Sequence, residues 1–234
     1  MNKILNHRLG LSAIALAILF NLPFSVLGAI YDYPDILRRP AGEALAKFAA
    51  GGPALILTWY GFALAALALA PLAVGLSITR ERLAERPALA IGAAVAGALA
   101  GMAQAIGLLR WVFVIPGLAH SHATGTPDAQ LAAERAFDLL NAYGGVAIGE
   151  HLGQLMTATF VLLLARLQWA EAARKTAAIG YVTAAVMVVG TGEGLALAMG
   201  ADGSAFGMAT VAGFMGLTLW MIATGVTLIR TRSA

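Results

Sequence analysis

Six long apolar segments, separated by short polar stretches, make up most of the sequence. Each holds about 20 or more residues with few charges, the length that a helix needs to cross the roughly 30 Å hydrocarbon core of a bilayer. The segments lie at about 9–30, 52–79, 87–119, 144–165, 176–199 and 206–229. The pattern predicts an all-α polytopic membrane protein, a bundle of six transmembrane helices that forms one transmembrane domain over residues 1–234.

The first apolar segment also shares features with a signal peptide. Lys3 and Arg8 precede it, and Val26 and Gly28 lie where a signal peptidase reads small residues. Its length of about 22 residues favours an uncleaved span. Cleavage would leave five spans and move the N-terminus to the other side of the membrane.

Two of the polar stretches have a helical pattern of their own. Residues 41–50 follow Pro40, a favoured first helical residue, and place their apolar side chains on one side. The second stretch starts at Thr126 and Pro127 and separates an apolar stripe from a polar one. The polar stripe holds Glu134, Asp138 and Asn141. We expect two short amphipathic interfacial helices that lie flat on the outer side, with a gating lid as the alternative.

The basic residues are divided unevenly between the two sides of the predicted bundle. Ten lie on the side of the termini and four on the other. The ten are Lys3, Arg8, Arg80, Arg82, Arg86, Arg166, Arg174, Lys175, Arg230 and Arg232, and the four are Arg38, Arg39, Lys47 and Arg135. By the positive-inside rule, this distribution predicts a multi-pass protein of a bacterial cytoplasmic (inner) membrane with both termini in the cytoplasm.

Composition agrees with a lipid environment and excludes several functions. Charged residues form 12% of the chain, against about 25% in soluble proteins. The net charge of +3 is spread over the membrane flanks, so nucleic acid is not an expected partner. The chain has no cysteine, which excludes disulfides, thiolate metal ligands and cysteine nucleophiles. Familiar catalytic motifs are missing from the sequence, so enzymatic activity stays open without a catalytic residue to name.

Four ionisable residues lie inside the predicted spans: Arg110, Glu150, His151 and Glu193. A charge at the centre of a span is unfavourable by about 2.5–3.5 kcal/mol, so each residue needs a structural or functional reason. Counting about 1.5 Å per residue from the predicted outer ends places all four about 10 Å below the outer surface. We therefore expect these side chains, which come from three different spans, to share one polar layer.

Helical spacing orients further side chains toward the same layer. Glu150, His151, Gln154 and Thr157 form one polar stripe that must face the interior of the bundle. Trp59 and Trp111 are near enough to line a pocket there, although an aromatic belt also explains tryptophans at this depth. The candidate ligand-binding residues are Arg110, Glu150, His151, Gln154, Glu193, Trp111 and Trp59.

These residues allow three functional hypotheses and one structural alternative. The first is a binding or transport protein for a small molecule or ion, in which Arg110 anchors an anion and the glutamates and His151 exchange protons. The second is a metal-dependent membrane enzyme, with His151, Glu150 and His120 as metal ligands and a metal ion as the only cofactor that the sequence suggests. Solvated interfacial histidines are the preferred explanation of His120 and His122.

The third hypothesis is an accessory subunit that contacts a membrane-protein partner through the outer loop Tyr31–Lys47. A homo-oligomer is a separate alternative. The structural alternative is a salt-bridge network that only holds the helices in register.

Three polar stretches of the sequence resemble a known family. They are Tyr33-Pro34-Asp35-Ile36-Leu37-Arg38 with Pro40, Leu108-Leu109-Arg110-Trp111 with Pro116, and Gly149-Glu150-His151-Leu152-Gly153. Together they resemble the bacterial membrane family called domain of unknown function 4386, over most of the chain. The resemblance implies a small multi-span membrane protein and carries no activity, substrate or catalytic residue.

Overall fold

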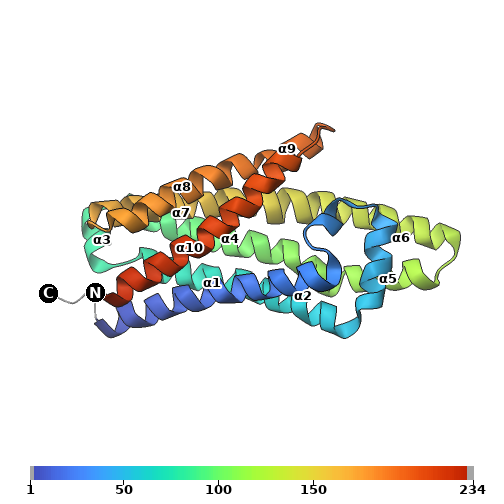
Figure 1. The fold of residues 1–234 in the computed structure, drawn as a ribbon, viewed down its shortest axis with the longest axis horizontal. Coiled ribbons are helices and arrows are strands. Elements are labelled where there is room, and N and C mark those ends of the chain that lie inside the picture. The colour runs from blue at the N-terminus through green and yellow to red at the C-terminus, as the bar shows by residue number, and fades with distance from the viewer. Residues whose placement is uncertain (1–2, 231–234) are drawn as a thin grey trace.

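The computed structural model describes residues 3–230, which form helices and no strand (Figure 1). Six candidate spans are long and apolar enough to cross a membrane, which confirms the predicted number. Arg232, one of the ten predicted cytoplasmic bases, lies outside the described residues. The elements are α1 (Lys3–Tyr31), the 3-10 helix η1 (Asp35–Arg38), α2 (Ala41–Ser77), α3 (Arg80–Glu85), α4 (Pro87–Phe113), α5 (Ile115–Thr124), α6 (Pro127–Leu140), the π-helix η2 (Asn141–Leu152), α7 (Gly153–Ala170), α8 (Arg174–Gly190), α9 (Gly192–Ala198) and α10 (Ser204–Arg230).

The six spans form a closed ring in chain order. α2 packs against α4, α4 against α7, α7 against α8, α8 against α10, α10 against α1, and α1 against α2. Short connections between apolar helices favour this arrangement of sequential antiparallel neighbours. α1 begins and α10 ends at the same end of the bundle (Figure 1). The opposite end is called the outer end below.

Glycines bring the backbones of α2 and α4 close together. A Cβ atom added to Gly97 would lie 2.2 Å from Cβ of Ala73, and one added to Gly101 would lie 2.8 Å from the carbonyl oxygen of Ala66. The sequence shows these two glycines at the small-xxx-small spacing that allows helices in lipid to approach closely. Gln104 continues the same face and donates a hydrogen bond of 2.8 Å to Oγ1 of Thr157 on α7.

A leucine at position 101 is expected to destabilise the protein strongly. Overpacking by a side chain against backbone is unfavourable by about 1–3 kcal/mol, so we expect Gly101→Leu to lower the melting temperature in detergent by about 5–10 °C. Gly61→Leu is the control, because no atom lies within 4 Å of the Cβ position at Gly61. Equal melting temperatures for the two variants would contradict the packing described for α2 and α4.

The outer end has a core of its own, rich in aromatic residues. It joins the ends of α1 and α4 to η1, α5, α6 and the first half of α2. The ring of Tyr31 meets the rings of Phe48, Trp59 and Trp111 edge to face. Such aromatic pairs add about 0.5–1.5 kcal/mol each beyond the burial of their area. The outer loop is therefore anchored on a packed core.

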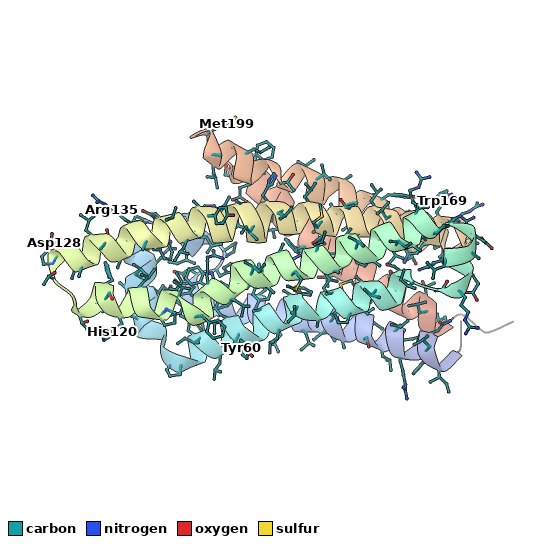
Figure 2. The ribbon with its side chains drawn as sticks, turned by 180° about the vertical axis from the view of Figure 1, so that it is seen from behind. Tyr60, His120, Asp128, Arg135, Trp169 and Met199 are labelled. Carbon is teal, nitrogen blue, oxygen red and sulfur yellow. The ribbon has the colours of Figure 1, made fainter. Side chains whose placement is uncertain are left out.

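The second of the two predicted interfacial helices is not a separate helix in the structure. α6, η2 and α7 form one continuous helical run from Pro127 to Ala170, so the second predicted segment is an extension of the fourth span (Figure 2). Asn141 keeps helical angles of φ −67° and ψ −45°, and no proline interrupts the chain there. The first segment, at the start of α2, lies across the long axis of the bundle (Figure 1). Gly52, with φ +60°, makes the bend that a residue with a side chain would rarely adopt.

Candidate functional site

Arg38 of η1 connects two glutamates from separate helices at the outer end. Its guanidinium donates to Oε2 of Glu150 at 2.6 Å and to Oε1 of Glu193 at 2.9 and 3.1 Å. The exposed fractions of the three side chains are 31%, 29% and 18%, so water reaches the contact from one side. We call these three residues the Arg38 bridge. It joins the outer loop, the fourth span and the fifth span.

The two carboxylates of the Arg38 bridge stabilise the positive charge of Arg38. Burial lowers the pKa of Arg38, but the carboxylates of Glu150 and Glu193 outweigh this effect and leave the pKa above its usual value. Arginine carries its charge under all ordinary conditions. The bridge therefore consists of charge-assisted hydrogen bonds from one permanently charged arginine to two carboxylates.

A second set of ion pairs fixes the outer loop that carries Arg38. Asp32, with φ +53°, accepts from the ammonium group of Lys47 and lies 3.2 Å from Nη1 of Arg39. Arg39 also pairs with Glu43 at 2.7 Å. The hydrogen bond from Lys47 lowers the pKa of Asp32. The loop is thereby tied to the first turns of α2.

Glu150 and His151 lie on the π-helix η2. π-helical turns are uncommon and occur frequently at functional sites. η2 packs very closely on α4, because a Cβ atom on Gly107 would lie 2.7 Å from Cα of Gly149. Gly107 and Gly149 let the π-helix approach α4 closely, and this contact positions the neighbouring Glu150.

Glu193 lies just after the break between α8 and α9. Nδ1 of His151 lies 3.0 Å from the carbonyl oxygen of Thr191 at that break, and because a carbonyl only accepts, Nδ1 carries the hydrogen. A Cβ atom on Gly207 would lie 3.3 Å from Oε1 of Glu193, so the start of α10 also borders the carboxylate. His151 is close to the Arg38 bridge but is not part of it.

Gln154 and Thr157 face the interior, as their spacing predicts. Gln154 is 2% exposed and Thr157 is fully buried. Nε2 of Gln154 donates to the carbonyl oxygen of Met187 at 2.9 Å, and Oγ1 of Thr210 donates to Oε1 of Gln154 at 3.3 Å. This network joins α7, α8 and α10 directly below the Arg38 bridge.

Arg110 is buried beside the Arg38 bridge without joining it. It is 8% exposed and forms no ion pair among residues 3–230. Its guanidinium donates to the carbonyl oxygen of Gly107 and, at 3.0 Å, to Oδ1 of Asn141, while its Nε has no partner. Asn141 in turn donates to the carbonyl oxygen of Leu37 at 3.1 Å. Arg110 is thus linked to the outer loop through neutral groups.

The two candidate tryptophans lie in the aromatic core. The rings of Trp59 and Trp111 stack at 4.8 Å with an angle of 9°, and both are buried. Cζ of Arg110 lies 5.1 Å from the ring centre of Trp111, within the range of a cation–π interaction. Tyr33 packs on Trp59, and its pKa is raised by burial and by the charge of Glu150. Trp111 thus packs against Arg110, and Trp59 stacks on the ring of Trp111.

The structure does not assemble the candidate metal ligands into one site. His120 lies on α5, beyond the break at Val114 and next to an apolar pocket, whereas His151 points to Thr191 and Glu150 pairs with Arg38. His122 pairs with Glu134 at 3.0 Å. Within the part of the chain that the structure describes, no three His, Asp or Glu side chains are close enough to hold a metal ion.

Both glutamates of the bridge lie far along their helical runs from the inner ends of α7 and α8. Glu150 is about 20 residues from Ala170, the inner end of α7, and Glu193 is about 19 residues from Arg174, the inner end of α8. At 1.5 Å per residue both lie about 30 Å from the inner ends, which is the thickness of the hydrocarbon layer. The depth of about 10 Å below the outer surface stays a prediction.

Comparison with known proteins identifies one matching family. The sequence profile of the family described as domain of unknown function 4386 matches residues 9–225. No curated protein and no solved structure gives a significant match. The matched residues include all three segments that meet in the Arg38 bridge, and the chain belongs to the family described as domain of unknown function 4386.

Proposed function

We propose that this protein binds a small molecule or ion from the outer side of a bacterial cytoplasmic membrane and transports it, with both termini in the cytoplasm. The Arg38 bridge is the observation that carries the proposal. A contact that joins an outer loop to two spans and is partly exposed to water is suited to open and close a site.

The charges around the bridge explain how binding and release would work. When Arg38 leaves, Glu150 and Glu193 face each other without a cation in contact, and a proton or a small cation then restores the balance. Arg110 stays buried with an unpaired Nε and can hold an anionic group that enters from the outer side. His151 and Gln154 lie next along the interior and continue the polar surface inward.

A binding screen with charge variants tests this function. Chloride, phosphate, acetate, guanidinium and sodium salts are added at equal ionic strength to the protein in detergent. We expect at least one of these ions to raise the melting temperature. We expect Arg110→Met or Glu150→Gln to abolish that shift, while Asp128→Asn, an exposed acid of α6, retains it.

Two results would count against the proposal. If none of these ions shifts the melting curve and both variants only lower the melting temperature, the polar residues are a structural network. If the shift survives in both variants, the ion binds elsewhere. If an ion does shift the melting curve in the expected way, measuring its flux into proteoliposomes distinguishes transport from binding without transport.

A further inference from the structure

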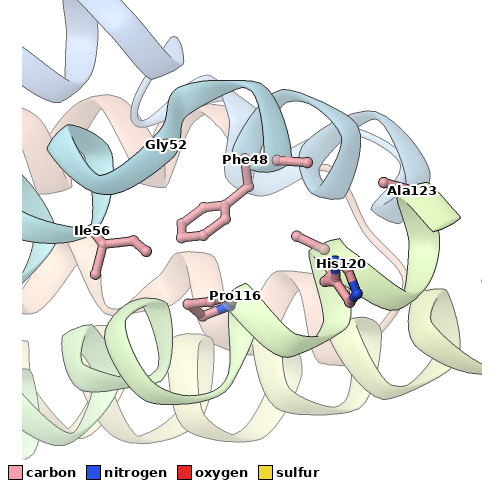
Figure 3. A pocket seen from close by; sticks show the side chains of 8 residues that line it. Phe48, Gly52, Ile56, Pro116, His120 and Ala123 are labelled. Atoms are coloured by element: carbon pink, nitrogen blue, oxygen red, sulfur yellow. The ribbon is translucent and has the colours of Figure 1, made fainter.

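A pocket separate from the Arg38 bridge lies between α2 and α5 at the outer end. Its volume is about 320 Å³, at the lower limit for small-molecule sites. Figure 3 shows Phe48 and Ile56 of α2 facing Pro116 and His120 of α5 across it. Ala49, Gly52, Ala119 and Ala123 complete the lining. Apart from His120, every lining side chain is apolar.

Breaks in both helices create the pocket. α2 bends at Gly52, and α4 gives way to α5 at Val114, just before Pro116. No atom lies within 4 Å of the Cβ position at Gly52 or at Gly117. The two helices therefore separate at the same level, and their own side chains leave the space between them open.

The pocket continues the surface that faces lipid. Ile56 is about 21 residues from Ser77, the inner end of α2, which places it about 31 Å away, at the outer edge of the hydrocarbon layer. Leu57 and Phe113, next to the lining residues, are 68% and 73% exposed. An apolar chain in the bilayer can thus reach the pocket without crossing a polar surface.

His120 gives the pocket one polar end. Its imidazole makes no hydrogen bond or ion pair with any residue from 3 to 230, and it lies on the outer side of Pro116. At this level the headgroups of the outer leaflet offer phosphate and ester oxygens that accept hydrogen bonds. An apolar pocket with a single donor at its outer rim fits an amphiphile better than a free ion.

We propose that this pocket binds one alkyl chain of an outer-leaflet phospholipid, with His120 donating to its headgroup. Native mass spectrometry of protein released from phosphatidylcholine nanodiscs tests the proposal. We expect the unmodified chain to retain one phospholipid at collision energies that remove the others. Ala49→Trp, which would place an indole in the pocket, should lower the retained fraction at least fivefold. His120→Leu, which removes the donor, should lower it to a smaller extent.

Leu64→Trp is the matched control, because Leu64 lies on the lipid-facing side of α2 and does not line the pocket. If Ala49→Trp does not fold, judged by its melting curve, Ala123→Phe fills the pocket from α5 and takes its place. Retention of the lipid by a folded pocket-filling variant would overturn the proposal. So would equal loss in Leu64→Trp, or no lipid retained by the unmodified protein.

Discussion

Replacing Arg38 with glutamine is expected to open the outer end between η2 and α9. The substitution removes both ion pairs of the Arg38 bridge and leaves two carboxylates near each other. Partly exposed ion pairs contribute about 0.2–1 kcal/mol each, and a total of about 1.4 kcal/mol corresponds to a tenfold change in the open population. The reporter is a cysteine at Val146, whose Cγ1 would lie 3.4 Å from a Cβ atom on Gly194 of α9.

The chain has no cysteine of its own, so the labelling is specific. We expect a membrane-impermeant maleimide to modify Val146→Cys about ten times faster with Arg38→Gln than with Arg38. Arg135→Gln is the control, because Arg135 is an exposed arginine of α6 that forms no ion pair among residues 3–230. A cysteine at the exposed Ala201 should react equally in all three backgrounds. Equal labelling rates at position 146 would show that Arg38 does not hold the site closed.

Adding one methyl group at Gly145 is expected to displace Arg110. A Cβ atom there would lie 2.4 Å from Nη2 and 2.8 Å from Cζ of the buried guanidinium. Gly145→Ala would also break the hydrogen bond from Arg110 to Asn141, which positions the outer loop through Leu37. We expect a loss of about 2–3 kcal/mol, measured as a fall of about 5–10 °C in the melting temperature.

Two comparisons distinguish this clash from a general effect of alanine in η2. Gly144→Ala should be tolerated, because the nearest atom to its Cβ position is Cδ of Arg110 at 3.8 Å. In an Arg110→Met background the clash with the guanidinium is gone and Oδ1 of Asn141, at 3.1 Å, is the remaining near atom. Gly145→Ala should then be neutral or stabilising, since alanine favours helix over glycine by about 1 kcal/mol. A similar loss in both backgrounds would mean that Gly145 does not shape the Arg110 site.

The six spans and their inward faces could be predicted because lipid restricts the options. A long apolar helix satisfies its own backbone hydrogen bonds in a bilayer, and helical spacing then fixes which residues share a face. Gln154 and Thr157 are buried for this reason, and Gly101 meets α2 as its small-residue spacing suggests. The binding roles of these residues stay predictions.

Arg38 could not be assigned to the site from the pattern. It lies in a loop, where no periodicity orients a side chain, and its contact depends on the 3-10 turn of η1 and on the ion pairs of Asp32. Counting depth grouped Glu150 and Glu193 with Arg110, and it gave no indication of a second arginine. The structure places Arg110 with neutral partners and gives the glutamates an arginine from outside the spans.

The continuity of α6 with α7 was also not evident from the sequence. Gly144 and Gly145, next to an amphipathic stretch, indicate a boundary between an interfacial helix and a span. In the structure both glycines stay helical within η2, where the absence of a side chain at Gly145 makes room for Arg110. The close packing of Arg110 explains why position 145 is a glycine. The hydrophobic pattern of the sequence carries no information about such packing.

The central claim, that Arg38 closes the outer site by binding Glu150 and Glu193 together, is tested most directly by a distance measurement across the bridge. Spin labels on cysteines at Asp35 of η1 and at Ala201, after α9, would report the separation by double electron–electron resonance. We predict one narrow distance distribution for the unmodified bridge, unchanged by Asp128→Asn and shifted to longer, broader distances by Glu150→Gln with Glu193→Gln. The same narrow distribution in the double glutamine variant would contradict the account.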